Sequence, residues 1–163
     1  MFKVSAMKSK NLVSYAIMLI AVTAFFFYGR GTASDEHVES TYAGPPEIVA
    51  ATFTSAWCSA CKILEPRLSK VRPNFTDKPV KFVDLDFTFG KNEEHQSLAD
   101  VNNFSEAYDR FKTGTGFTLL IDAETGKVID TLTMNHSKEA MRAAIAQAIA
   151  FASRPEPETA QVE

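Results

Sequence analysis

The two cysteines constrain this chain more than any other feature, because both lie in segment 57–62, which reads Trp-Cys-Ser-Ala-Cys-Lys. The apolar and β-branched run 48–54 comes shortly before this segment and is typical of a buried strand. From Cys58 to Val71, apolar residues recur every three or four positions, which predicts an amphipathic helix. The sequence therefore places a C-x-x-C pair at a junction between a strand and a helix.

A thiol at the N-terminus of a helix lies near backbone N–H groups and the positive end of the helix dipole, and both lower its pKa. We therefore expect Cys58 to be the nucleophile. Cys61 lies three residues further along on the same side of the predicted helix, within reach of a mixed disulfide formed at Cys58. These positions predict thiol–disulfide exchange, with Cys61 as the resolving thiol.

A C-x-x-C pair also occurs in zinc sites, which need four ligands. The chain has no second cysteine pair, and its histidines are His37, His95 and His136. We interpret His95 as a polar-loop residue and His136 as a helix-cap residue, and we expect no metal site. An alternative stays open, which is a binding module whose two thiols hold a soft metal such as Cu(I), or which binds a partner with little oxidoreductase activity.

The remaining pattern predicts an α/β domain over residues 47–153. Pro66 falls inside the first predicted helix and is expected to kink it. Residues 88–104 show no clear period. The other predicted elements are strand 80–87, helix 105–112, strands 117–121 and 128–134 joined by a hairpin, and helix 138–153 with Asn135 or Ser137 as N-cap. We expect a central mixed sheet of about four strands, with the first two parallel and helices on both faces.

The Trp-Cys-Ser-Ala-Cys-Lys motif, the downstream Pro66 and the order of elements resemble the thioredoxin family from about Ile48 to Ala152. The order is similar to the thioredoxin fold without its first strand and helix. This resemblance implies a thiol–disulfide oxidoreductase that acts on protein thiols or disulfides. It implies no cofactor beyond a reversible Cys58–Cys61 disulfide.

The resemblance also implies supporting roles for the residues around the cysteines. Trp57 is a candidate lid over the sulfurs, with a partly buried surface aromatic as the alternative. Ser59 and Ala60 form the dipeptide that tunes the stability of the thiolate. Lys62 is a candidate support for the Cys58 thiolate, although we favour a solvated helix residue.

One departure from the family pattern concerns the strand that faces the active site. If Thr118 and the residues after it form that strand, Phe117 stands where thioredoxins usually have a cis-proline. A cis bond before a residue other than proline costs about 2.5 to 4 kcal/mol. We therefore expect the Gly116–Phe117 bond to be trans and the backbone that docks the substrate to differ.

A second departure concerns the buried acid that the family commonly has six residues before the first cysteine. Thr52 occupies that position. Asp84 and Asp86 are the alternatives for this role, but Asp is seldom buried, so we expect solvated carboxylates at the end of a strand.

The N-terminal segment is predicted to direct the chain to a membrane. Residues 1–10 carry three lysines and no acid, and residues 12–28 carry no charge, which reaches the lower end of the roughly 17 to 25 residues that span a bilayer. We interpret residues 1–33 as an anchor, or alternatively a cleaved signal. Residues 34–46 are predicted to be a linker and residues 154–163 a disordered tail.

The positive-inside rule keeps the lysines in the cytoplasm and exports the remainder of the chain. We therefore expect the domain to face the periplasm from a bacterial inner membrane, or to be periplasmic if the segment is cleaved. Beyond Ala33 the chain has 13 basic against 20 acidic residues, because Lys3, Lys8, Lys10 and Arg30 all precede that point. Nucleic-acid binding needs a basic face, so we expect no nucleic-acid partner.

Overall fold

The structure, a computed structural model, describes residues 41–90 and 92–154. The predicted membrane segment 12–28, residues 34–40 of the predicted linker and residues 155–163 of the predicted tail lie outside the described residues. Among the helices of the described ranges, none has both the length and the apolar character needed to cross a bilayer.

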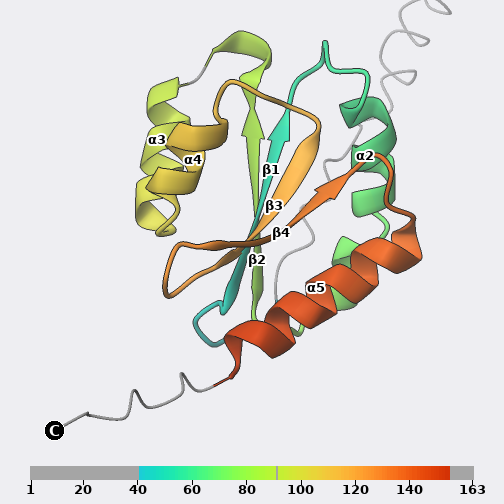
Figure 1. Cartoon of the computed structure of the whole chain (residues 1–163), viewed down its shortest axis with the longest axis vertical. Helices are drawn as coiled ribbons and strands as arrows, with labels where there is room; N and C mark the ends of the chain where they lie inside the picture. The colour runs from blue at the N-terminus through green and yellow to red at the C-terminus, as the bar shows by residue number, and fades with distance from the viewer. Residues whose placement is uncertain (1–40, 91, 155–163) are drawn as a thin grey trace, which may run out of the picture. The chain divides into compact units, whose positions relative to one another are not determined.

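The described residues form one mixed β-sheet with helices on both faces (Figure 1). In chain order the elements are β1 (Ile48–Thr54), α2 (Cys61–Leu68), the 3-10 turn η1 (Arg72–Phe75), β2 (Val80–Asp86), the 3-10 turn η2 (Phe87–Phe89), α3 (Asn92–Val101), α4 (Ser105–Phe111), β3 (Phe117–Asp122), β4 (Val128–Thr133) and α5 (Lys138–Ala152). Within the described part of the chain the strand order is β2-β1-β3-β4. β1 runs parallel to β2 and antiparallel to β3, and β3 and β4 form an antiparallel hairpin. The predicted α/β class and the mixed four-stranded sheet are confirmed.

β1 is the central strand on which both hydrophobic cores are built. Successive side chains of a strand point to opposite faces of the sheet. Ile48 and Ala50 face the core under α2, η1 and α5, whereas Val49, Ala51 and Phe53 face the core under α3 and α4 (Figure 1). β1 is hydrogen-bonded to β2 on one edge and to β3 on the other, and it is packed on both faces. These contacts fix the position at which β1 ends, directly before the cysteine motif.

The first helix is shorter than the periodicity predicted. It begins at Cys61 rather than Cys58, because the N–H of Cys58 donates to the carbonyl of Ser55 at 3.0 Å and closes a turn before the helix. Pro66 lies inside α2, and the helix ends at Leu68 rather than Val71.

Helix α3 lies within residues 88–104, the segment whose sequence showed no clear helical or strand period. His95 lies in this helix and is buried, so its interpretation as a polar-loop residue was wrong. Its ring packs edge-on against Phe87 with the ring centroids 4.6 Å apart. The apolar contribution of α3 to the core includes Ala99 and the half-buried Leu98, which is too little to produce a visible helical pattern.

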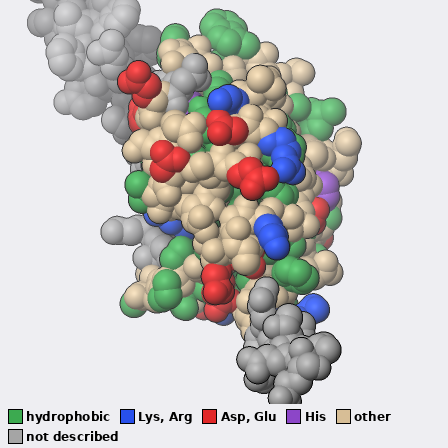
Figure 2. Space-filling view, turned by 60° about the vertical axis from the view of Figure 1, so that its left-hand side comes forward, with side chains coloured by type: hydrophobic (Ala, Val, Ile, Leu, Met, Phe, Trp, Pro, Cys, Tyr) green, Lys and Arg blue, Asp and Glu red, His purple; other side chains and the backbone are tan. Residues whose placement is uncertain are grey.

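Charged side chains of both signs are interspersed on the face that Figure 2 shows. α4 carries two exposed ion pairs at helical spacing, Glu106 with Arg110 and Asp109 with Lys112, each at 2.8 Å. Exposed pairs of this kind contribute little to stability. This face therefore presents mixed charge and no continuous basic patch.

Candidate active site

The two cysteines lie where the turn after β1 meets the first residue of α2. Cys58 is half-buried, whereas the Cys61 side chain is 2% exposed. The backbone N–H of Cys61 donates to the Cys58 sulfur at 3.2 Å. Ala60, the residue that caps α2, has no side chain able to accept a hydrogen bond. The Cys58 sulfur therefore takes the place of a capping oxygen for one of the unpaired N–H groups at the start of the helix.

The surroundings of Cys58 favour its thiolate. Partial burial raises the pKa of this thiol, but hydrogen bonds from the Cys61 thiol, the Thr115 side chain and the backbone N–H groups of Cys61 and Ala60 outweigh it. The pKa of Cys58 is therefore lowered from its ordinary value.

The surroundings of Cys61 have the opposite effect. Burial and the hydrogen bond with Cys58 raise the pKa of Cys61, and the hydrogen bonds from the Ser55 backbone and the Thr54 side chain offset them only in part. The pair is therefore asymmetric, with a half-exposed thiol that ionises readily and a buried thiol that retains its proton.

Gly116 forms the wall of the site opposite the cysteine turn. Its N–H donates to the carbonyl of Phe53 at 2.7 Å, and it has a φ of +96°, a left-handed conformation that favours glycine. A Cβ atom at this position would lie 2.8 Å from the Ala60 Cβ and 3.1 Å from the Cys58 sulfur. Thr115 and Gly116 are residues of the site that the sequence motif did not indicate, and the positive φ explains the glycine.

Phe117, predicted to occupy the docking position, is half-buried in the core under α3 and α4. Its ring stacks on Phe53 with the centroids 4.9 Å apart and meets Phe111 edge-on at 5.9 Å. The Gly116–Phe117 peptide bond is trans, as are the other peptide bonds of the described residues. The structure thus brings Gly116, rather than the Phe117 side chain, to the sulfurs.

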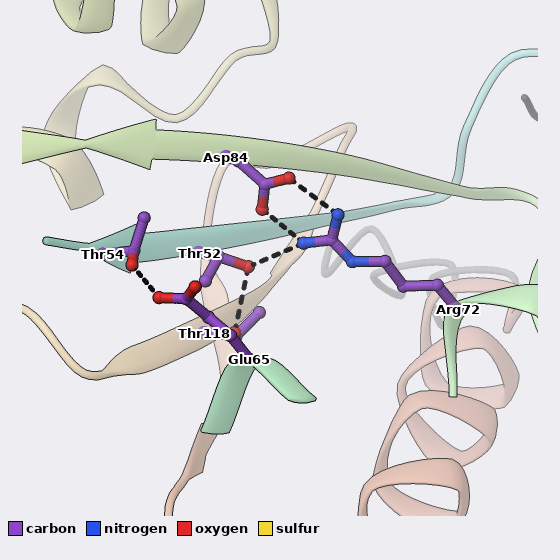
Figure 3. Close-up of polar contacts among 6 residues, drawn as sticks. All are labelled: Thr52, Thr54, Glu65, Arg72, Asp84 and Thr118. Carbon is purple, nitrogen blue, oxygen red and sulfur yellow. Dashed lines mark hydrogen bonds and ion pairs between the residues drawn. The ribbon is translucent and has the colours of Figure 1, made fainter. Parts of the chain in front are cut away.

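Thr118 points to the other face of the sheet, where it meets Thr52 (Figure 3). Their hydroxyl oxygens are 3.1 Å apart, and a guanidinium nitrogen of Arg72 donates to the Thr52 hydroxyl at 3.4 Å. Arg72 also holds the carboxylate of Asp84 through both terminal nitrogens, one of them at 2.7 Å. Thr52, at the position where the family commonly has a buried acid, therefore presents a neutral hydroxyl beside the Arg72 guanidinium. Asp84 is an exposed carboxylate that is paired with Arg72.

Three predicted supporting residues lie on the surface around the motif. Trp57 is 81% exposed, and Ser59 and Lys62 are exposed as well. Ala60 is half-buried and lies against Gly116. The structure therefore gathers the predicted motif at one place, with Trp57 presented to solvent at its edge.

A pocket of about 290 Å³ opens beside Cys61. Its lining residues are Thr54, Ser55, Ala56, Cys61, Lys62, Glu65, Asp86 and Thr88. The Thr54 hydroxyl donates to the Glu65 carboxylate at the edge of this pocket (Figure 3). The amphipathic pattern of this segment gives no sign of this contact between Thr54 and Glu65.

A family model matches part of the chain. The profile of the family described as Thioredoxin matches residues 31–108. This match covers 78 of the 163 residues of the chain. No curated protein sequence matches the chain.

Several solved structures resemble this thioredoxin-like domain. A mutant thioredoxin from Halobacterium salinarum is 21% identical, covers 64% of this chain and 76% of its own, and superposes with a TM-score of 0.40. StoA from Bacillus subtilis is 14% identical, covers 62% and 84%, and gives a TM-score of 0.42. The oxidised thioredoxin from Plasmodium falciparum is 20% identical, covers 64% and 83%, and gives a TM-score of 0.39.

The match to the Thioredoxin family model supports a redox-type function in general terms. Within residues 41–90 and 92–154, no group of three or more potential ligands is arranged to hold a metal ion.

Proposed function

We propose that the domain is a thiol–disulfide oxidoreductase that exchanges disulfides with protein partners through Cys58 and Cys61. The observation that carries this proposal is the hydrogen bond from the Cys61 N–H to the Cys58 sulfur. It stabilises a thiolate on the accessible cysteine and fixes the buried cysteine next to it.

The reaction has two exchange steps. The Cys58 thiolate attacks one sulfur of a partner disulfide, a Cys58–partner bond forms, and the first partner thiolate leaves and takes a proton from solvent. Cys61 then loses its proton and attacks the Cys58 sulfur, so that the Cys58–Cys61 bond forms and the second partner thiolate leaves. The partner gains two electrons and the protein loses two. The reverse sequence transfers the disulfide to the partner, and the relative reduction potentials decide the direction.

We further propose that the partners are exported proteins and that residues 12–28 attach the chain to a membrane. The lysines of residues 1–10 and the uncharged run after them support this proposal. A reporter enzyme fused after Glu163 is expected to be active only outside the cytoplasm. A reporter that is active in the cytoplasm contradicts export without affecting the proposed exchange chemistry.

Disulfide exchange by three forms of the protein tests the proposed reaction. The wild type is expected to reduce a protein disulfide when a reductant is supplied, and Cys58→Ser is expected to be inactive. Cys61→Ser is expected to attack once and to remain as a mixed disulfide, which mass spectrometry detects as an adduct on Cys58. An active Cys58→Ser variant overturns the assignment. Full wild-type inactivity together with tight Cu(I) binding by both thiols supports the binding module instead.

A further inference from the structure

The resolving step requires a proton acceptor that the family's usual position does not supply here. Cys61 is 2% exposed and must ionise before it attacks the mixed disulfide. Thr52 stands where the family commonly has a buried acid, and a hydroxyl beside the Arg72 guanidinium is not a base. A different group must therefore receive the proton of Cys61.

Thr54 lies in one pocket with Cys61 and with a carboxylate on the next turn of α2, that of Glu65. Thr54 lines the same pocket as Cys61, and its side chain is one of the groups whose interaction with the Cys61 sulfur lowers the pKa of that thiol. The same Thr54 hydroxyl donates to the carboxylate of Glu65 (Figure 3). Glu65 lies four residues after Cys61, so both side chains lie on the same side of the helix. A hydroxyl that accepts on one side and donates on the other is suited to pass a proton.

The pocket beside Cys61 connects this set of residues to solvent. Cys61, Thr54 and Glu65 all line it, and Glu65 is an exposed residue. The other charged side chains at this pocket are Lys62 on α2 and Asp86 at the end of β2. The Asp86 carboxylate accepts the backbone N–H of Thr88 at 2.8 Å. Glu65 is the carboxylate that the described hydrogen bonds join to Thr54.

We propose that Glu65, acting through the Thr54 hydroxyl, accepts the proton of Cys61 when Cys61 attacks the mixed disulfide. The Cys61 thiol gives its proton to the Thr54 oxygen while the Thr54 hydroxyl proton passes to the Glu65 carboxylate. The Cys61 sulfur bonds to Cys58, and the partner leaves as a thiolate that takes a proton from solvent. Glu65 then returns its proton to solvent through the pocket. This inference rests on the proposed function.

Stopped-flow reaction with one equivalent of dithiobis-nitrobenzoate separates the two exchange steps, because each step releases one coloured thiolate. The first phase reports attack by Cys58, and the second reports resolution by Cys61. Glu65→Gln is expected to slow the second phase at least about tenfold near neutral pH and to leave the first phase unchanged. The deficit is expected to shrink as pH rises, since hydroxide then deprotonates Cys61 directly.

Substitutions of Thr54 test whether the hydroxyl is the bridge. Thr54→Val is expected to slow the second phase as Glu65→Gln does, and Thr54→Ser, which keeps a hydroxyl, is expected to restore it. The double variant Thr54→Val/Glu65→Gln is expected to be no slower than either single variant, because both break one path. Glu124→Gln removes the same charge from the hairpin at the opposite end of β3 and serves as the matched control, with both phases unchanged.

The outcomes distinguish this inference from the proposed function. If the wild type shows no first phase, the proposed function fails. If the first phase is normal and Glu65→Gln resolves as fast as wild type, only the role of Glu65 fails. A faster second phase in Glu65→Gln also overturns that role, because it means that the Glu65 charge merely opposes the Cys61 thiolate. A slow second phase that is equally slow at every pH indicates altered geometry and likewise contradicts proton transfer.

Discussion

The hydroxyl oxygens of Thr52 and Thr118 lie 3.1 Å apart, and the two residues are direct partners in the pairing of β1 with β3. Both side chains are buried, on the sheet face that α2 covers. Only Thr52 is also reached by Arg72, at 3.4 Å. The two residues are thus of the same type and equally buried, but they differ in their remaining hydrogen bonds. Thr52 keeps its contact with Arg72 when Thr118 is replaced, whereas the structure gives Thr118 no second partner of this kind when Thr52 is replaced.

Valine substitutions of these threonines are expected to differ in cost. Thr52→Val leaves the Thr118 hydroxyl buried without the partner that the structure gives it, which costs about 1 to 3 kcal/mol. Thr118→Val leaves Thr52 its contact with Arg72, so a loss of about 1 kcal/mol is expected. Denaturant unfolding measures both values. A double variant at least as stable as Thr52→Val is expected, and strictly additive losses contradict the coupling.

The lowered pKa of Cys58 and the raised pKa of Cys61 predict different pH profiles for alkylation. A lower pKa populates the thiolate at lower pH, so labelling of Cys58 is expected to accelerate below the pH at which a peptide cysteine does. Labelling of Cys61 is expected to accelerate only above that pH. Mass mapping of iodoacetamide adducts across a pH series checks this order. Earlier labelling of Cys61 reverses the assigned roles.

Gly116→Ala is expected to damage both stability and exchange. The positive φ alone costs an alanine about 1 to 3 kcal/mol, and the new Cβ meets Ala60 and Cys58. Gly90→Ala is the matched control, because Gly90 also has a positive φ but its Cβ would have no atom within 4 Å. Unfolding and exchange rates are measured on both variants. We expect slower exchange only in Gly116→Ala, and equal rates in the two variants contradict the close approach to Cys58.

Phe117→Ala is expected to destabilise the fold. The ring packs against Phe53 and Phe111 but is only half-buried, so we expect a loss of about 2 to 3 kcal/mol, below that of a fully buried phenylalanine. Phe89→Ala provides the comparison, because Phe89 is 85% exposed and its loss is expected to cost less than about 0.5 kcal/mol. Denaturant unfolding of both variants measures the difference, and equal stabilities contradict a packing role for Phe117.

The fold could be predicted from the sequence where hydrophobic pattern and turn chemistry agree. The strand Ile48–Thr54 has the predicted bounds, because a central strand buried on both faces produces an uninterrupted apolar run. Ser137 is the N-cap of α5, one of the two predicted candidates, because its side chain accepts the N–H of Ala140. The parallel pairing of β1 with β2 follows from the handedness of the crossover between them.

The features that could not be predicted from the sequence depend on contacts between residues in different elements of the fold, which a local sequence pattern does not reveal. α3 was not recognised because a buried histidine, His95, occupies part of its inner face. The contact between Thr54 and Glu65 depends on how the end of a strand lies against the second turn of a helix. The position of Phe117 was inferred from a family alignment, which assigns a residue to a site but does not give the direction of its side chain.

The close approach of Gly116 to Cys58 affects how other proteins with the same site can be recognised from their sequences. A protein that shares the Trp-Cys-x-x-Cys segment but carries a side chain at the position of Gly116 must move Ala60 or the cysteine turn to accommodate it. Thr115 and Gly116 thus form a second sequence signature, far from the first along the chain and adjacent to it in space. Chains that match both signatures are the ones in which this arrangement of sulfurs should recur, whereas the cysteine spacing alone selects a much broader set.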